Sequence, residues 1–348
     1  MTVQSLYHTF QRYRTLQTDR VSSLPIVILM PHSACNCRCV MCDIWKDNKN
    51  LKQLTENDIS GLLETLKKFG TRQVVMSGGE ALLNPNFFRF CEMLKKTDVK
   101  ISLLSTGLLL KNHALQIVDN IDDIILSLDG DELLHDRIRN VPGAFRKLRE
   151  GVDSVRKLQP DLKITARTVI HRLNFRNWAA IIDTANNIGL NQISFLPADV
   201  SSHAFNREVL WTEPRQHEIL IQEKELPELK AILELIVAAY KTEFDEKFIA
   251  ETPDKLRKIY DYYAAFYGLN DFPYKRCNAP WVSAVIESDG TVKPCFFHEA
   301  IGNMREQPLD RILNSEEAIH FRKTLDMETN STCRKCVCSI NLTPKTKL

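Results

Sequence analysis

The strongest constraint on the fold is a regular alternation of apolar strand segments with amphipathic helical segments over the first two-thirds of the chain. Six segments are predicted to be buried strands because they are short and largely apolar. These strands lie at 26–31, 73–77, 100–105, 123–129, 163–170 and 192–197, and helical patterns occupy 55–70, 85–96, 144–158 and 178–188. Right-handed crossovers between such units predict a parallel sheet, open or closed into a barrel, with functional residues at the carboxyl ends of its strands.

The pattern changes after about residue 201. Segment 201–224 is predicted to be a loop, and 225–266 two helices. A compact cysteine-bearing segment then begins at residue 275. It holds a hairpin with an Asp289-Gly290 turn and a helix at 309–325. We therefore predict an α/β fold divided into an N-terminal extension (1–24), a barrel (25–215), a helical connector (216–270) and a small cysteine-rich α+β domain (271–348).

Charge and hydropathy exclude several classes of protein. The 46 basic and 44 acidic residues leave a formal charge of +2, which gives no electrostatic case for a nucleic-acid partner. No apolar run approaches the ~18 residues of a membrane span. The N-terminal segment also lacks the apolar core of a signal peptide. We expect a cytoplasmic protein with no membrane or nucleic-acid partner.

Cys35, Cys39 and Cys42 lie in the loop after the first predicted strand, with the spacing C-x3-C-x2-C. Three thiolates from one short loop can hold an iron–sulfur cluster. Three protein ligands for four irons would leave one iron open to a small molecule. A zinc site and buried free thiols are the alternatives. Cys37 fits neither spacing and is predicted to be a bystander.

A second group of cysteines closes the chain: Cys277, Cys295, Cys333, Cys336 and Cys338. The first two flank the predicted hairpin, and the others follow the last predicted helix. Four thiolates from two such elements can enclose a metal centre, which would stabilise a segment of this size. Spacing alone supports zinc and iron–sulfur equally well.

The first cysteine loop, CNCRCVMC, resembles the cluster loop of the radical S-adenosylmethionine (radical SAM) superfamily, whose fold is a partial, TIM-like (β/α)6 barrel. Gly78, Gly79 and Glu80 end the second predicted strand, as the GGE motif of that family does. The resemblance implies a [4Fe–4S] cluster on the three loop cysteines, with S-adenosylmethionine (SAM) bound to its open iron. It also implies that the GGE strand end holds the amino group of SAM.

Further SAM contacts are implied by the same resemblance. Ser127 and Asp129 in SLDG, with Arg139 in HDRIRN, are similar to an S-x-D-G…H-D-x-x-R stretch whose Ser and Arg hold the carboxylate and ribose of SAM. Thr106 lies in an STG segment similar to the family's STNG, from which the Asn is missing. Met41 stands where many members carry an aromatic residue near the adenine. Leu196 completes the implied set.

The second cysteine group, with its CNAPW and GTVKPC segments, resembles the SPASM/twitch extensions of radical SAM enzymes, which bind auxiliary [4Fe–4S] clusters. Five cysteines fit the shorter twitch form with one cluster. The implied ligands are Cys277, Cys295, Cys333 and Cys336, and Cys338 could replace one of them. Four protein ligands would make this cluster an electron relay, whereas an open iron would let it hold substrate.

The activity that the resemblance implies is reductive cleavage of SAM to methionine and a 5′-deoxyadenosyl radical, which abstracts a hydrogen atom from substrate in the barrel mouth. A flavodoxin- or ferredoxin-type protein would donate the electron. The auxiliary cluster would accept an electron from the substrate radical. Arg167, Asn174, Asp199, His203 and His298 are weaker candidates for contacts with SAM or substrate.

The substrate class is less constrained. We expect net oxidation or bond-forming modification of a small molecule such as an alcohol or aminocyclitol, as in the similar 2-deoxy-scyllo-inosamine dehydrogenase. The alternative is a ribosomally made peptide, for which the segment before the first strand is short. A third option is molybdopterin-precursor synthesis, but the C-terminal Gly-Gly that is typical of that function is absent, since the sequence ends in KTKL. The hypothesis from a different class of function is that the chain is a zinc-binding regulatory protein built on a degenerate barrel.

Overall fold

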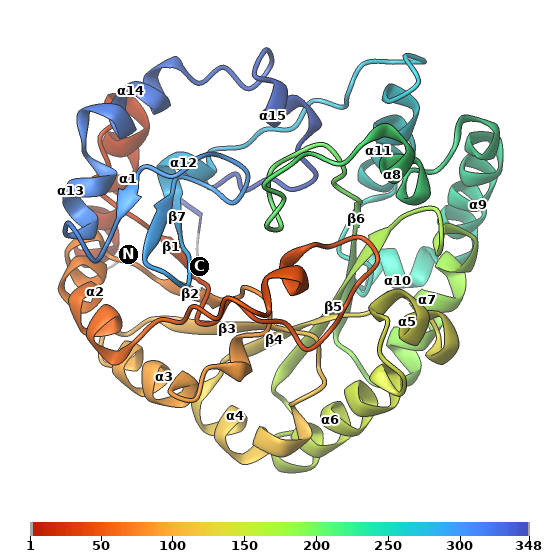
Figure 1. Cartoon of the computed structure of the whole chain (residues 1–348), viewed down its shortest axis with the longest axis horizontal. Coiled ribbons are helices and arrows are strands. Elements are labelled where there is room, and N and C mark those ends of the chain that lie inside the picture. Colours follow the sequence, from red (N-terminus) through yellow and green to blue (C-terminus); the bar gives the residue numbers. More distant parts are fainter. Residues whose placement is uncertain (1–2, 347–348) are drawn as a thin grey trace.

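The computed structural model describes residues 3–346, and in that part of the chain nine strands form one sheet. The strands follow the order β6-β5-β4-β3-β2-β1-β7-β8-β9 across the curved sheet (Figure 1). In chain order, β1 to β9 span Ile26–Leu29, Gln73–Met76, Lys100–Ser105, Asp123–Ser127, Lys163–Ile170, Gln192–Pro197, Ser283–Ile286, Thr291–Lys293 and Gly302–Asn303.

Strands β1 to β6 pair in sequence order and are all parallel, which confirms the six predicted strands. Strand β6 lies at one edge of the sheet, so the barrel is partial, as expected. The intervening helices cover the outer face of the sheet in Figure 1. They are α2 (Glu56–Phe69), α3 (Phe87–Lys95), α4 (Ala114–Asn120), α5 (Glu132–Arg139), α6 (Ala144–Leu158) and α7 (Trp178–Asn187).

The side chains of β5 and β6 alternate between the helical layer and the barrel interior. Phe195 of β6 packs against Trp178 of α7, with ring centroids 5.2 Å apart, so the neighbouring Ser194 faces the opposite side of the sheet. Arg167 of β5 is the register partner of both Ser194 and Ser127 of β4. These three polar residues therefore form a row across three strands that faces the barrel interior.

The predicted hairpin is confirmed, and it continues the barrel sheet. Strand β7 pairs parallel to β1 in full register, and β8 returns antiparallel to β7. The turn uses Gly290 at φ 86°, a left-handed conformation that glycine adopts without strain. The cysteine-bearing C-terminal segment is thus attached to the first strand of the barrel, beside the loop that carries the first cysteine group.

Three helical predictions need correction. Segment 225–266 holds three helices instead of two, because the short α10 (Lys241–Asp245) follows α9 (Leu226–Ala239). Segment 201–224 is not all loop, because it contains α8 (Glu213–Ile219) and a 3-10 turn. The helix predicted at 309–325 is two helices, α13 (Leu309–Leu313) and α14 (Glu316–Thr324), because Ser315 caps the second by accepting a hydrogen bond from the Ala318 amide at 3.1 Å. The remaining helices are α1 (Val3–Thr18), α11 (Pro253–Ala265), α12 (Ala279–Val282) and α15 (Ser331–Lys335).

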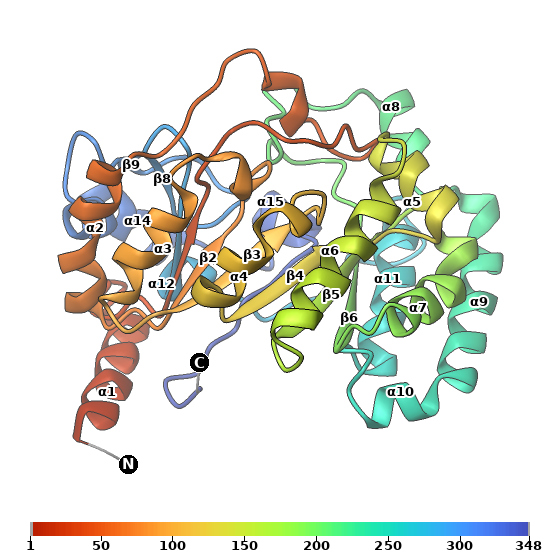
Figure 2. The same cartoon turned by 90° about the horizontal axis from the view of Figure 1, so that it is seen from below.

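Helix α1 extends away from the barrel in Figure 2. Arg12 of this helix donates to the Thr346 carbonyl at 2.6 Å, which brings the two ends of the described chain together. Across residues 3–346, no helix has both the length and the apolar character needed to cross a membrane. The predicted domain boundaries stay predictions, and residues 1–2 and 347–348 of the two outermost segments lie outside the described part.

Candidate functional site

The first cysteine loop follows β1 and is fixed from within by two side chains that come shortly after it. Asn48 brackets Cys35, accepting from its amide at 3.0 Å and donating to its carbonyl at 2.9 Å. The indole N–H of Trp45 donates to the carbonyls of Cys42 at 2.9 Å and Cys39 at 3.3 Å. The backbone at all three predicted cluster ligands is therefore held in place by neighbouring residues.

A second segment, residues 198–215, also holds the loop; we call it the strap. The indole N–H of Trp211 donates to Asp43 Oδ2 at 2.7 Å. Arg207 and Arg215 donate to the carbonyls of Met41 and Val40. Arg207 also pairs with Asp199 at 2.5 Å, and both side chains are fully buried. The strap thus connects the end of β6 to the cysteine loop.

The GGE segment brings the end of β2 against the same loop. The Glu80 amide donates to the Ala34 carbonyl at 2.9 Å. A Cβ on Gly79 would lie 2.2 Å from that carbonyl oxygen, a distance at which atoms overlap. Glycine is therefore required at position 79, because the backbone just before Cys35 passes directly over it.

The Glu80 carboxylate is fully buried and joins β2 to the end of β3. It accepts hydrogen bonds from Ser105 Oγ at 3.0 Å, the Thr106 amide at 2.8 Å and Thr106 Oγ1 at 2.7 Å. Burial raises the pKa of Glu80, while the hydrogen bonds from Thr106 lower it. The side chains of Glu80 and Thr106 are committed to each other, so any contact of these residues with SAM falls to their backbone.

Arg139 occupies a buried position between the loop and β4. Its Nη1 donates to Cys39 Sγ at 3.4 Å, and its Nη2 pairs with Asp129 at 2.5 Å. A hydrogen bond from the buried Cys37 thiol and the charge of Arg139 lower the pKa of Cys39, while burial opposes them. Burial raises the pKa of Asp129, and Arg139 opposes that rise. Arg139 thus places a permanent cation beside one predicted cluster ligand.

The remaining predicted SAM contacts lie at the same end of the barrel. Ser127 ends β4 and is half-buried on the interior face, Leu196 lies near the end of β6, and Met41 is buried in the cysteine loop. The Asn36 side-chain amide lies 2.9 Å from Thr106 Oγ1, whose single hydroxyl proton also lies toward Glu80, and the other polar atom of this buried amide has no hydrogen-bond partner among the described residues. An unpaired polar atom in a buried amide next to the cysteines fits a site built to hold a polar ligand.

The donor set suits an iron–sulfur cluster, because all three predicted ligands are thiols from one short loop. In residues 3–346, no three Cys, His, Asp or Glu side chains are arranged to hold one metal ion. Burial raises the pKa of Cys35 and Cys42 to about 12, and each thiol also interacts with Cys39. The ligands of a [4Fe–4S] cube bind different irons, so their sulfurs need not converge on one point as zinc ligands do.

The second cysteine group lines a single cavity. Cys277, Cys295, Cys333, Cys336 and Cys338 all contribute to its wall. They come from the segment before α12, the end of β8, and α15 with the residues after it. Cys336 Sγ donates to the Cys338 carbonyl at 2.9 Å. The structure therefore brings all five together, and which four would bind a cluster stays a prediction.

Lys275 indicates which kind of metal centre fits this cavity. Its ammonium lines the cavity, donates to the Cys336 carbonyl and lies 5.4 Å from the Tyr262 ring. Burial lowers the pKa of Lys275, and within the described chain no acidic side chain pairs with it. A half-buried cation that faces five thiols and has no carboxylate partner fits an anionic, thiolate-bound cluster.

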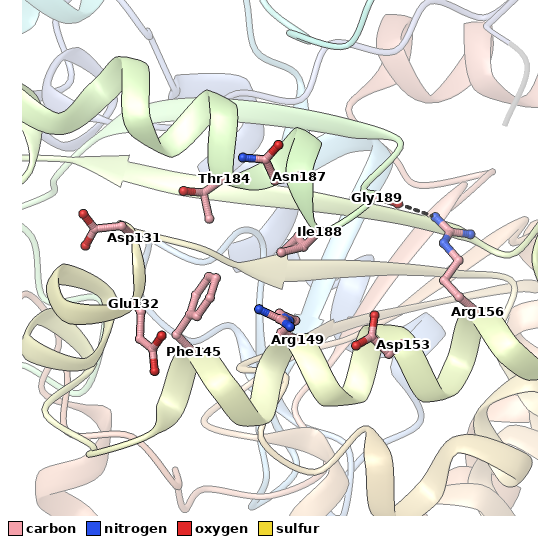
Figure 3. Close-up of a pocket in the computed structure, with 10 residues that line it drawn as sticks. All are labelled: Asp131, Glu132, Phe145, Arg149, Asp153, Arg156, Thr184, Asn187, Ile188 and Gly189. Carbon is pink, nitrogen blue, oxygen red and sulfur yellow. Dashed lines mark hydrogen bonds between the residues drawn. The ribbon is translucent and has the colours of Figure 1, made fainter.

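A separate hollow lies on the outer surface between α6 and α7 (Figure 3). Arg156 lies at one end, where it donates to the Gly189 carbonyl at 3.2 Å, and Phe145 and Arg149 line the floor along α6. None of the predicted site residues lines this hollow. Its position outside the barrel separates it from both cysteine groups.

Comparisons with known proteins agree with this geometry. A model of the radical SAM superfamily matches residues 29–185, and a model of the SPASM iron–sulfur cluster-binding domain matches residues 277–337. The chain therefore contains a radical SAM domain followed by a SPASM iron–sulfur cluster-binding domain. The two matched segments contain the first cysteine group and four of the five cysteines of the second.

Similar proteins carry several different activities in their names. The Fe-coproporphyrin III synthase of Methanosarcina barkeri is 23% identical over 330 residues, which cover 90% of this chain and 80% of the synthase. A probable GTP 3′,8-cyclase of Saccharolobus solfataricus is 24% identical, covering 76% of this chain and 80% of the cyclase. Streptococcus suis SuiB bound to the precursor peptide SuiA superposes with a TM-score of 0.66 at 14% identity, covering 94% of this chain and 74% of SuiB.

This radical SAM protein is an enzyme whose cofactors are SAM, the [4Fe–4S] cluster that binds SAM, and an auxiliary [4Fe–4S] cluster. The structure also shows residues near these sites that the sequence did not single out. Asn48, Arg207, Trp211 and Lys275 lie outside the motifs, and Asn36 lies within the cysteine-loop motif without being one of its predicted ligands. Only their position after folding reveals what they contact.

Proposed function

We propose that this enzyme cleaves SAM at the first cysteine loop. The resulting radical then oxidises a small-molecule substrate held in the barrel or forms a new bond in it. The observation that carries the proposal is the convergence of three segments at one barrel end. The cysteine loop, the GGE segment and Arg139 meet there through the Glu80–Ala34 and Arg139–Cys39 contacts. When bound, the cluster supplies the electron that splits SAM into methionine and a 5′-deoxyadenosyl radical.

The chain's own residues divide this work. Cys35, Cys39 and Cys42 would hold the cluster through three irons. Ser127 and Arg139, at the ends of β4 and α5, would hold the carboxylate and ribose of SAM. The unpaired polar atom of the Asn36 amide would hydrogen-bond to the bound SAM. The strap is hydrogen-bonded to the loop and would limit the access of water to the radical.

The auxiliary cavity would accept the electron that the substrate radical loses. Cys277, Cys295, Cys333 and Cys336 would hold this cluster, with Cys338 as a fifth thiol. The charge of Arg167 acts on Cys338, so the interior row on β4 to β6 lies within electrostatic reach of this cavity. A flavodoxin- or ferredoxin-type protein is the proposed electron donor to the first cluster.

Arg167 and Ser194, which continue the interior row beyond Ser127, form the proposed substrate wall. The Arg167 side chain is exposed, and no hydrogen bond or ion pair with a described residue fixes it. Its guanidinium can bind a hydroxyl, carboxylate or phosphate of a small molecule. Some relatives are named for small-molecule substrates such as GTP, and SuiB binds a precursor peptide. A peptide is therefore the alternative substrate.

Metal analysis of anaerobically purified protein tests the proposal. We expect about eight irons per chain and an absorbance band near ~400 nm, because two [4Fe–4S] clusters are proposed. Replacing Cys35, Cys39 and Cys42 together by Ala should remove about half of that iron, and replacing Cys277 and Cys295 should remove the other half. Colourless protein with stoichiometric zinc would contradict the proposal and favour a binding protein.

A further inference from the structure

His298 lies three residues after Cys295 and faces the auxiliary cavity from the segment that follows β8. Its Nε2 is 3.3 Å from Cys333 Sγ. The ring packs edge-on against Phe321 of α14, with centroids 4.9 Å apart. This packing fixes the orientation of the imidazole, so the contact with the sulfur is set by the fold.

A neutral imidazole carries one N–H and can place it on Nε2. The thiolate sulfur of a cluster ligand is negatively charged and accepts such a hydrogen bond well. Hydrogen bonds to cluster sulfurs are among the factors that set the reduction potential of an iron–sulfur cluster. Reduction adds one negative charge to the cluster, and a donor that points at a ligand sulfur stabilises that charge.

We propose that His298 donates an Nε2–H···Sγ hydrogen bond to Cys333 in the loaded enzyme and thereby raises the reduction potential of the auxiliary cluster. The inference rests on the proposed function, since it requires a cluster in this cavity. Lys275, which lines the same cavity, adds a positive charge that acts in the same direction. His298 is thus a positioning residue that makes the cluster a better electron acceptor.

The geometry favours this role over direct ligation of iron by His298. Five thiols already line the cavity, which exceeds the four corners of a [4Fe–4S] cube. The His298 nitrogen is also directed at a sulfur that is itself a predicted ligand. Ligation by His298 is therefore an outcome that the experiment must be able to detect.

The experiment uses the full chain in which Cys35, Cys39 and Cys42 are all Ala, so that only the auxiliary cluster assembles. In this background we compare the His298→Leu and His298→Gln variants with the parent, which keeps His298. The control is His320→Leu, at an exposed position of α14. Iron content, the midpoint potential from an EPR-monitored redox titration, and ¹⁵N hyperfine coupling after histidine labelling are measured on each protein.

We expect equal iron content, a lower midpoint potential in His298→Leu, and partial recovery in His298→Gln, whose side-chain amide can still donate. A weak ¹⁵N coupling should be present in the parent and in His320→Leu and absent in both His298 variants. A strong coupling typical of an Fe–N bond would overturn the inference, as would an unchanged potential with no coupling. If His298→Leu fails to assemble a cluster, the ¹⁵N coupling of the parent and the midpoint potential of His298→Gln still test the inference.

These outcomes separate the inference from the function on which it rests. An iron-free parent would refute the proposed auxiliary cluster, and the inference would fall with it. If the parent holds about four irons and its midpoint potential does not change when His298 is replaced, the inference alone is refuted.

Discussion

Arg139 Nη1 donates to Cys39 Sγ across 3.4 Å, at the point where the end of helix α5 meets the first cysteine loop. The other terminal nitrogen of Arg139 pairs with Asp129, just beyond the end of β4. One buried guanidinium therefore links a predicted cluster ligand to the strand end that is proposed to hold SAM. A planar, forked cation can make both contacts at once, and a lysine ammonium cannot reproduce that geometry.

Substitution of Arg139 by Lys should weaken SAM binding while the protein stays folded. Loss of a buried, charge-assisted hydrogen bond costs about 1.5–3 kcal/mol, or roughly a ten- to hundred-fold loss of affinity. Calorimetric titration of the reconstituted enzyme with SAM measures this change. Arg137→Lys, at an exposed position of the same helix, is the matched control. Equal SAM affinity in the two variants would show that Arg139 does not position SAM.

Gly79→Ala should block assembly of the first cluster. The new Cβ would overlap the Ala34 carbonyl, so the backbone before Cys35 would have to move. We expect about half of the wild-type iron to be lost after reconstitution, because the auxiliary cavity is unaffected. Gly61→Ala in helix α2 meets nothing within 4 Å and should keep full iron, with a stability gain of about 0.5–1 kcal/mol. A full iron content in Gly79→Ala would contradict the close packing of Gly79 against the Ala34 carbonyl.

Glu80→Ala should destabilise the protein because it leaves the donors of Ser105 and Thr106 buried without an acceptor. An unsatisfied buried donor costs about 1–3 kcal/mol, so the free energy of unfolding should fall by at least that amount. Urea denaturation of the metal-free chain measures the change. Glu80→Gln keeps one acceptor oxygen and should fall between wild type and Glu80→Ala. Identical unfolding curves would show that the carboxylate does not join β2 to β3.

Trp211→Phe tests the strap. The substitution removes the indole donor to Asp43 and should loosen the cysteine loop, since Asp43 follows Cys42 directly. We expect iron to leave the first cluster several-fold faster in the presence of a chelator. Tyr240→Phe removes a comparable aromatic donor to Asp183 of α7, outside the barrel, and should leave the rate unchanged. Equal rates in both variants would argue against a clamping role for the strap.

The sequence was enough to predict the barrel because its signals are local. Apolar runs and helix periodicity placed all six parallel strands, and the Asp289-Gly290 turn placed the hairpin. The strap could not be predicted in this way. The contacts of Trp211 and Arg207 with the cysteine loop join residues more than 160 positions apart, and no periodic pattern marks them. The break between α13 and α14 depends on a single serine cap, which a longer helical pattern concealed.

The predicted SAM contacts illustrate the same limit. Motif resemblance predicted SAM contacts for Glu80 and Thr106, and the structure places both residues at the barrel end that carries the cysteine loop, where their side chains are hydrogen-bonded to each other. The sequence also offered no reason to rank His298 above His203. Only the fold shows that His298 contacts a predicted cluster ligand, whereas His203 contacts the Arg207 carbonyl within the strap.

The most direct test of the central claim is 5′-deoxyadenosine formation by Cys35→Ala, assayed anaerobically with SAM and a strong chemical reductant. The wild-type enzyme and Cys91→Ala, which alters a buried thiol in α3 that belongs to neither cysteine group, should both form 5′-deoxyadenosine. Cys35→Ala should form none while keeping its auxiliary iron. Continued formation of 5′-deoxyadenosine by Cys35→Ala would contradict the assignment of SAM cleavage to this loop.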